Sequence, residues 1–367
     1  MASYFLLRLA IFTHMKKNEY KVLGIMSGTS LDGIDVALLN FKRASAWEYE
    51  IEKAETIPYP TEWHKKLSEA VFYSDPQLVE LNRQFTTYLA RLISDFKDQH
   101  DIQHLDAVCS HGHTIKHEPQ NGFTLQIGNL PELADLIDET VICDFRVQDV
   151  ELGGQGAPLV PIGDELLFRD YEYCLNLGGF ANVSTNSNGQ RLAYDICAVN
   201  TVMNYLAEKL GKPYDRNGEI AAGGSLDEDL LAKLSAIDFY GHKPPKSLGI
   251  EWVNQKIFPL LHEAEISTAL HTYVIHVADQ IARNLDGDSS SKVLVTGGGA
   301  FNGFLMERIK AETKNQIVIP SPQLVNYKEA LIFGFLGILR LREEINVLGS
   351  VTGASKNHCS GKIFLPR

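Results

Sequence analysis

The stretch Gly24-Ile-Met-Ser-Gly-Thr-Ser-Leu-Asp-Gly-Ile-Asp-Val-Ala-Leu-Leu39 decides the fold of this 367-residue chain. Two apolar runs flank a break rich in Gly, Ser, Thr and Asp, a pattern that predicts a strand, a tight turn and a second strand. The break also offers hydroxyls and closely approachable backbone N–H groups, from which anion-binding turns are built. We therefore expect a phosphate to bind here, although an ordinary hairpin would carry similar glycines.

The break is not a Walker P-loop. Gly28 and Gly33 keep the Gly-x4-Gly spacing, but Ile34 and Asp35 stand where that motif requires Lys and Ser or Thr. Any phosphate bound here would be held mainly by backbone groups.

Composition excludes several classes of partner. Lys and Arg number 34 against 46 Asp and Glu, which gives a net charge of −12 with no basic block. Nucleic acid and anionic membrane surfaces are therefore not expected as partners. The five cysteines are widely spaced and form no Cys-x-x-Cys pair, as in a cytoplasmic protein with reduced thiols.

The first residues look separate from the fold. Residues 5–12 are apolar but interrupted by Arg8, and they fall far short of the roughly 20 residues that a membrane-spanning helix needs. Met15 precedes the first strand as a natural start would. We interpret residues 1–14 as a leader or extension.

The rest of the chain alternates strands and helices. Apolar periodicity predicts strands at 47–56, 106–110, 124–127, 141–145, 191–196, 292–296 and 317–319, and helices at 61–73, 76–100, 129–137, 200–210, 226–237, 268–285, about 303–311 and 328–344. The densest Gly and Pro punctuation, at 151–163, marks a candidate domain boundary. Residues 173–185 then repeat the pattern of strand, glycine turn and strand, with Gly178 and Gly179 at the turn. This repeat suggests two related halves, each presenting a phosphate loop toward a shared cleft.

A triple glycine offers a second nucleotide contact. A buried strand runs into Gly297, Gly298 and Gly299, and a helix follows Asn302. Bare backbone at a positive helix end suits a nucleotide, although a helix packed tightly on its strand would show the same residues. Asn302 stands where the Rossmann fingerprint requires a small residue, so NAD is not expected.

Asp195 and three histidines are the other candidates for chemistry. Asp195 lies at the end of a predicted strand, where carboxylates of α/β active sites gather, and it could act as a general base or cap the following helix. His111 and His113 are expected on one strand face, with His117 following. Because no third ligand stands at a defined spacing, turn and cleft-lining roles are favoured over a metal site, and the metal ligands stay unknown.

Taken together, these stretches resemble the anhydro-N-acetylmuramic acid kinase family. The similarity spans residues 21–354, and its motifs occur in the family's order: 24–35, Ser110-His-Gly-His-Thr114, Thr124-Leu-Gln-Ile-Gly128, Asp144-Phe-Arg146, 153–161, Asn176-Leu-Gly-Gly179, Pro244-Pro-Lys-Ser247, Gly297-Gly-Gly-Ala300, Lys328-Glu-Ala330 and Val351-Thr-Gly-Ala354.

The resemblance implies an α/β fold of two duplicated actin-like ATPase (ribonuclease H-like) domains with an interdomain cleft. We place the first domain at 20–150 plus 335–367 and the second at 151–334. The implied reaction uses ATP and Mg²⁺ to open the 1,6-anhydro ring of anhydro-N-acetylmuramic acid with water and to phosphorylate O6, in peptidoglycan recycling. We expect a cytoplasmic homodimer with this small sugar as its substrate.

The resemblance also assigns site residues. Asp195 falls on the family's catalytic aspartate, which takes a proton from the water that attacks C1. The expected sugar contacts are His113, Thr114, Gln126, Arg146 and Glu329. The expected nucleotide contacts are Gly28, Thr29, Ser30, Leu31, Asp32, Gly33, Ile34, Asp35, Gly178, Gly179, Gly297, Gly298, Gly299 and Asn302.

Two departures from the family pattern leave alternatives open. Asp195-Ile-Cys-Ala-Val-Asn200 replaces Asp-Thr-Gly-Pro-x-Asn, so the shape of the turn near the γ-phosphate is open while the base is kept. His113 replaces the family's usual Gln. The alternatives are a kinase for another sugar and a non-catalytic sugar or nucleotide sensor, although a regulator's basic recognition helix is not evident.

Overall fold

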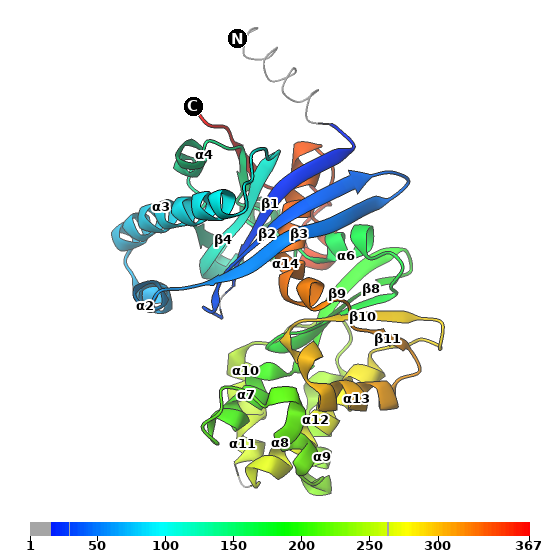
Figure 1. Cartoon of the computed structure of the whole chain (residues 1–367). Helices are drawn as coiled ribbons and strands as arrows, with labels where there is room; N and C mark the ends of the chain where they lie inside the picture. Colours follow the sequence, from blue (N-terminus) through cyan, green and yellow to red (C-terminus); the bar gives the residue numbers. More distant parts are fainter. Residues whose placement is uncertain (1–15, 29, 263) are drawn as a thin grey trace. The chain divides into compact units, whose positions relative to one another are not determined.

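The computed structural model describes residues 16–28, 30–262 and 264–367 (Figure 1). It contains two compact units, the chain up to Leu167 together with Tyr327–Arg367, and Phe168–Asn326. The extension at 1–14 and Thr29 of the expected phosphate turn lie outside the described residues. No helix in the described ranges is long and apolar enough to cross a membrane.

The first unit is built on a mixed seven-stranded sheet with the order β12-β6-β4-β1-β2-β3, and β5 pairs with β4. The opening strand, turn and strand form β1 and β2, which are antiparallel, and β4 and β6 continue the sheet in parallel with β1. The strands are β1 (Glu19–Ser27), β2 (Gly33–Arg43), β3 (Trp47–Pro58), β4 (Ala107–Glu118), β5 (Phe123–Ile127), β6 (Val141–Cys143) and β12 (Lys362–Phe364).

The second unit repeats this topology. Its sheet has the order β11-β10-β7-β8-β9, again three antiparallel strands followed by two parallel ones. The strands are β7 (Tyr173–Leu177), β8 (Phe180–Ser187), β9 (Gln190–Ala198), β10 (Lys292–Thr296) and β11 (Gln316–Val318). The shared strand order confirms the predicted duplication of an α/β, ribonuclease H-like domain.

Helices cover both faces of the first sheet. Leu23 and Ile25 of β1 pack with the long helix α3, which starts at a Ser74–Gln77 capping box. On the opposite face, Gly24 lies so close to α14 that a Cβ there would be 2.1 Å from the carbonyl oxygen of Ala330. The helices that contribute to this unit are α2 (Thr61–Glu69), α3 (Asp75–Gln99), α4 (Glu132–Ile137), α5 (Val147–Glu151), α6 (Pro161–Leu167), α14 (Pro322–Leu341), which crosses the unit border, and α15 (Gly349–Thr352).

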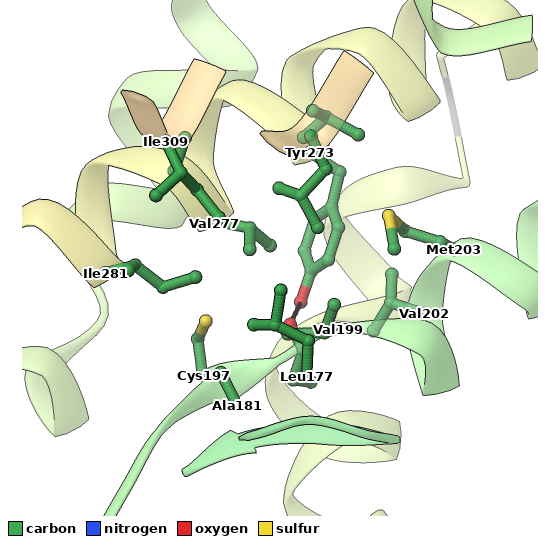
Figure 2. Packing of buried hydrophobic residues seen from close by; sticks show 14 of the residues in the cluster. Leu177, Ala181, Cys197, Val199, Val202, Met203, Tyr273, Val277, Ile281 and Ile309 are labelled. Carbon is green, nitrogen blue, oxygen red and sulfur yellow. Dashed lines mark hydrogen bonds between the residues drawn. The ribbon is translucent and has the colours of Figure 1, made fainter. Parts of the chain in front are cut away.

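The second unit is centred on α12, whose apolar face packs behind the sheet. Figure 2 shows Tyr273 and Val277 of α12 turned toward Cys197 of β9 and Val199, which follows β9. The Tyr273 hydroxyl donates a hydrogen bond to the carbonyl of Ala198 at 2.9 Å. The helices are α7 (Asn200–Glu208), α8 (Glu219–Gly223), α9 (Glu228–Ser235), α10 (Ile250–Lys256), α11 (Phe258–Leu261), α12 (Ile266–Arg283) and α13 (Gly303–Glu312).

The unit borders fall at 167/168 and 326/327, whereas the sequence placed the borders at 150/151 and 334/335. Residues 151–167 belong to the first unit because α6 contacts β3 and because the Gly156 N–H donates to the Asp149 carboxylate. The backbone of α14 departs from helical geometry at Tyr327, where the chain re-enters the first unit.

Two strands are longer than the sequence suggested. β4 continues past Ser110 to Glu118, and β9 continues past Ile196 to Ala198. The predicted shared face for His111 and His113 is wrong, because Gly112 has φ of +76° and the β1–β4 register slips by one residue here. The His111 ring consequently packs on Phe333 of α14, and the His113 ring packs near Phe85 of α3.

Candidate active site

The β1–β2 turn of the first unit has the geometry expected of an anion-binding loop. The Leu31 N–H donates to the Gly28 carbonyl at 3.4 Å, and Leu31 has a left-handed φ of +61°. A Cβ on Gly33 would lie 2.4 Å from the Ile57 carbonyl oxygen, so the bend accepts only glycine there. At Gly28 the closest atom to such a Cβ among the described residues, Ser30 Oγ, would be 3.6 Å away, so the protein leaves that backbone open to approach. Ser30 and Asp32 are exposed on this turn, and Ile34 is buried at the start of β2.

Asp35 adds a carboxylate just after the turn. Its Oδ1 accepts a hydrogen bond from Thr56 Oγ1 at 2.6 Å across the β2–β3 pair. Burial raises the pKa of the Asp35 carboxyl, the Thr56 hydroxyl opposes this, and the nearby Asp32 charge raises it further. Two carboxylates that repel one another beside this turn form a donor set suited to a hard divalent cation.

His113 is joined to the end of β1, next to the β1–β2 turn, through Ser27. His113 Nδ1 lies 2.7 Å from Ser27 Oγ, which is 2.5 Å from the Tyr59 hydroxyl. Burial lowers the pKa of His113 to about 4, so its ring is neutral at pH 7. The end of β1, the β3–α2 connection and β4 are thereby linked in one hydrogen-bonded group.

Thr114 and Gln126 lie opposite one another on β4 and β5. Gln126 Nε2 donates to Thr124 Oγ1 at 2.8 Å and, over a longer distance of 3.3 Å, to Thr114 Oγ1. Gln126 Oε1 is buried and has no partner within the described ranges. An amide held at its nitrogen with a partnerless oxygen is suited to receive a hydroxyl or amide hydrogen of a ligand.

Arg146 is anchored where β6 leads into α5. Its Nε donates to His111 Nε2 at 2.8 Å and its Nη1 donates to the Gly156 carbonyl at 2.6 Å. Burial lowers the pKa of Arg146 to about 10, and the negative charges of Glu329 and Asp149 oppose that shift. Arg146 is therefore a cation at neutral pH, with the exposed Glu329 of α14 in its electrostatic neighbourhood.

In the second unit, three segments meet at the carboxyl ends of β7 and β10, which are parallel neighbours. The Gly178 and Gly179 carbonyls accept hydrogen bonds from Asn200, Val199 and Thr201 at the start of α7. Gly297 has φ of +82°, and a Cβ on Gly299 would lie 2.7 Å from Leu177 Cβ. At Gly298, Asn200 Nδ2 is the only atom of the described residues within 4 Å of such a Cβ, at 3.7 Å. Gly298 is thus the approachable backbone of the triple glycine, and its neighbours serve close packing.

Asn302 has a structural role in addition to its candidate nucleotide role. Its Oδ1 accepts from the Leu305 N–H at 3.0 Å, which caps the N-terminus of α13, and its side chain is buried.

Asp195 lies within β9, and the alternative that it caps the next helix is wrong. The residue at the N-cap of α7 is Val199, which makes no side-chain cap. Asp195 Oδ2 instead accepts from the Leu248 N–H at 2.8 Å, and its backbone N–H donates to the Lys246 carbonyl at 3.0 Å. Burial raises the pKa of the Asp195 carboxyl, and the Leu248 hydrogen bond only partly opposes this. A carboxylate with a raised pKa is better suited to accept a proton.

The unusual segment after Asp195 points into the core. Ile196, Cys197, Ala198 and Val199 are all fully buried. The β8–β9 register slips at Ile196, a bulge of the kind that re-aims side chains beside active sites. The Asn200 side chain is anchored beside β7, because its Nδ2 donates a hydrogen bond to the Leu177 carbonyl at 3.0 Å. The apolar replacements therefore supply packing while Asp195 and Asn200 are retained.

Several of these contacts were not foreseen from the sequence. Ser27 contacts His113 over 86 positions and Tyr59 over 32 positions, and Leu248 contacts Asp195 over 53 positions. Separations of this size leave no local pattern in the sequence. The sequence favours only a turn or cleft-lining role for His111, whereas the structure pairs it with Arg146. Within the described ranges, no three His, Cys, Asp or Glu side chains gather to hold a metal ion.

Comparison with known proteins identifies the family. The family model described as Anhydro-N-acetylmuramic acid kinase matches residues 20–366. Proteins of that name from Pasteurella multocida and Coxiella burnetii are each 33% identical to this chain, over 95% of it and 98% of their own length. The one from Chromobacterium violaceum is 32% identical, over 93% and 98%.

Solved structures give weaker matches. The activator of the 2-hydroxyisocaproyl-CoA dehydratase from Clostridium difficile is 14% identical, with a TM-score of 0.43 over 87% of this chain and 95% of its own. A ROK family glucokinase from Streptomyces griseus is 10% identical, with a TM-score of 0.39 over 86% and 98%. The sequence match over nearly the whole length decides the assignment: the chain belongs to the anhydro-N-acetylmuramic acid kinase family.

Proposed function

We propose that this chain uses ATP to open the 1,6-anhydro ring of anhydro-N-acetylmuramic acid and to phosphorylate O6, giving N-acetylmuramic acid 6-phosphate for peptidoglycan recycling. The family match over residues 20–366 supports this activity. The observation that carries the mechanism is Asp195, a half-buried carboxyl with a raised pKa that is held by the Leu248 N–H. It lies on β9, which pairs with β8 directly after the Gly178–Gly179 turn.

The chemistry assigned to Asp195 is proton acceptance. Water forms a new bond to C1 as the C1–O6 bond breaks, and its proton passes to the free oxygen of the Asp195 carboxylate. The departing O6 forms a bond to the γ-phosphorus of ATP while the bond from that phosphorus to the bridging oxygen breaks, which releases ADP. Because Leu248 holds Oδ2, Oδ1 is the atom we assign as the base.

The nucleotide would be held by bare backbone of both units. We assign the β1–β2 turn around Gly28 to the phosphates, together with the Gly178–Gly179 turn and the approachable Gly298. The carboxylates of Asp32 and Asp35 fit Mg²⁺, which would supply charge neutralisation of the phosphates. We also propose that these phosphate-binding turns face a cleft shared by the two units.

The sugar would be held by the first unit. The protein groups that we assign to contact the polar groups of the sugar are the cationic Arg146, the carboxylate of Glu329, the partnerless Gln126 Oε1, the hydroxyl of Thr114 and the His113 ring. The lactyl group of a muramic acid carries a carboxylate, which would favour a cation such as Arg146.

The enzyme would act in the cytoplasm as a homodimer. Reduced thiols support the location, since four of the five cysteines are buried and all are free. Sedimentation equilibrium measures the oligomeric state, and a monomer at micromolar concentration would contradict the dimer.

The deciding experiment incubates purified protein with Mg-ATP and a panel of anhydro and free amino sugars in ¹⁸O-labelled water. We expect ADP formation with anhydro-N-acetylmuramic acid, a 6-phosphate product, and one ¹⁸O atom at C1 with none in the phosphoryl group. Phosphorylation of a different sugar would favour the other-kinase alternative. Sugar or ATP binding with no turnover of any sugar would favour a sensor.

A further inference from the structure

His111 is a buried histidine on β4 that the reaction above does not use. Its side chain is 3% exposed, and its ring packs on the Phe333 ring of α14 at a centroid distance of 4.6 Å. The His111 carbonyl accepts from Asn129 Nδ2 at 3.2 Å, so backbone and ring are both restrained.

The hydrogen bonds of this ring determine its tautomer. A guanidinium group has only donors, so His111 Nε2 must be the acceptor of the 2.8 Å bond from Arg146 Nε. The hydrogen of the neutral ring then lies on Nδ1, which is 2.8 Å from the Gly112 carbonyl, an acceptor. Both ring nitrogens are therefore used, one to fix the ring and one to hold the guanidinium.

A second anchor holds the opposite side of the guanidinium. Arg146 Nη1 donates to the Gly156 carbonyl at 2.6 Å, and the Gly156 N–H donates to Asp149 Oδ2 at 2.7 Å. Asp149 is fully buried and its Oδ1 accepts from Thr352 Oγ1 at 2.7 Å. Arg146 Nη2 makes no hydrogen bond within the described part of the chain, so the two anchors leave that nitrogen for a ligand.

We propose that His111 is a positioning residue for the sugar site, whose neutral imidazole accepts from Arg146 Nε and orients the remaining guanidinium nitrogen toward the acidic sugar. This inference rests on the proposed function, because it takes Arg146 as a sugar contact. Burial and the Arg146 charge lower the pKa of His111 well below its ordinary value, which keeps the acceptor lone pair available at physiological pH. Holding a rotamer-rich Arg before binding reduces the entropy lost when the sugar is bound.

The test uses a matched pair of variants. His111→Gln places an amide oxygen close to the position of Nε2, whereas His111→Asn ends near Nδ1 and cannot reach Arg146. We expect the Gln variant to keep kcat/KM for the sugar within about threefold and the Asn variant to lose about 10- to 100-fold, as is typical when a supporting hydrogen bond is removed. KM for ATP should change less than about twofold in both variants, because the lost hydrogen bond supports the binding of the sugar and not that of ATP.

Controls separate positioning from folding. The same pair at His276, a buried histidine of α12 in the second unit, should leave sugar kcat/KM unchanged within about twofold. Melting curves check that each variant is folded. If His111→Asn does not fold, His111→Gln alone is compared with His111→Gln/Arg146→Ala and Arg146→Ala.

Double variants identify the residue through which His111 acts. In an Arg146→Ala background, adding His111→Asn should lower sugar kcat/KM by less than about twofold, because the effect requires Arg146. Equal activity of the His111 Gln and Asn variants, or full additivity with Arg146→Ala, would overturn the positioning role. In the fallback set, a His111→Gln loss as large as that of Arg146→Ala would overturn it. If Arg146→Ala itself left sugar KM unchanged, the proposed sugar site would be refuted, and the role of His111 with it.

Discussion

Replacing Asp195 by Asn separates the catalytic reading of this residue from a structural one. Asn is nearly isosteric, and its side-chain oxygen can still accept from the Leu248 N–H at the 2.8 Å observed for Oδ2. The backbone bond from Asp195 to the Lys246 carbonyl is unaffected. What the variant lacks is an oxygen that can take a proton from water.

The expected loss of turnover is large. A positioned general base contributes about 10²- to 10⁴-fold, so kcat should fall by that factor, equivalent to about 2.7–5.4 kcal/mol in the activation barrier. The KM for ATP should stay within about twofold, because the glycine turns that would hold the phosphates are unchanged.

Stability should not fall, and the sign follows from the pKa. Burial raises the folded-state pKa of Asp195 above its ordinary value of 3.8. At neutral pH the ionised carboxylate therefore destabilises the folded protein, and this penalty disappears as pH falls below the unfolded value. Asn carries no charge, so at pH 7 the melting temperature of Asp195→Asn should equal or exceed that of the unaltered protein.

Asp227 provides the matched control in the same unit. Its Oδ1 accepts from the Leu230 N–H at 2.9 Å and caps α9. Asp227→Ala should lose about 1 kcal/mol of stability and keep its turnover. Coupled ADP-release kinetics and calorimetric melting measure both quantities. Near-normal formation of the 6-phosphate by Asp195→Asn would refute the assigned base, and a lowered melting temperature would show that its carboxylate is structural.

Three further outcomes are expected. Gly28→Val should fold normally, because the closest described atom to a Cβ there is 3.6 Å away, but should raise the ATP dissociation constant at least about tenfold in calorimetric titration; unchanged affinity would reject the phosphate turn. The pKa of about 4 for His113 means that stability falls as pH drops from about 6.5 toward 4, by up to about 3 kcal/mol, and urea unfolding of His113→Gln should show a weaker dependence. The buried ammonium of Lys328 lies 2.7 Å from the Asp164 carboxylate, so Lys328→Met removes the cation of a buried ion pair and should destabilise the protein by about 3–5 kcal/mol. A denaturation midpoint equal to that of the unaltered protein would contradict this.

Local sequence was sufficient for the elements and for the turns that need glycine. Strands on both sides of the break at 28–33 follow from two apolar runs separated by turn-forming residues. The long helix α3 follows from apolar residues at helical spacing after a Ser-Asp-Pro start. These features depend on residues within a few positions of one another, so a single sequence displays them.

The tertiary structure alone decided which side chains meet. Gly112 turns His113 away from the face of His111, which no alternation rule anticipates because one left-handed residue and a register slip reverse the pattern. The Arg146–His111 bond joins residues 35 positions apart, and Asp149 reaches Thr352 over 203 positions. Asp195 is held by a loop 53 residues downstream and not by the helix that follows it. Such contacts depend on how strands order themselves in a sheet, and hydrogen-bond geometry between distant segments exists only after the chain has folded.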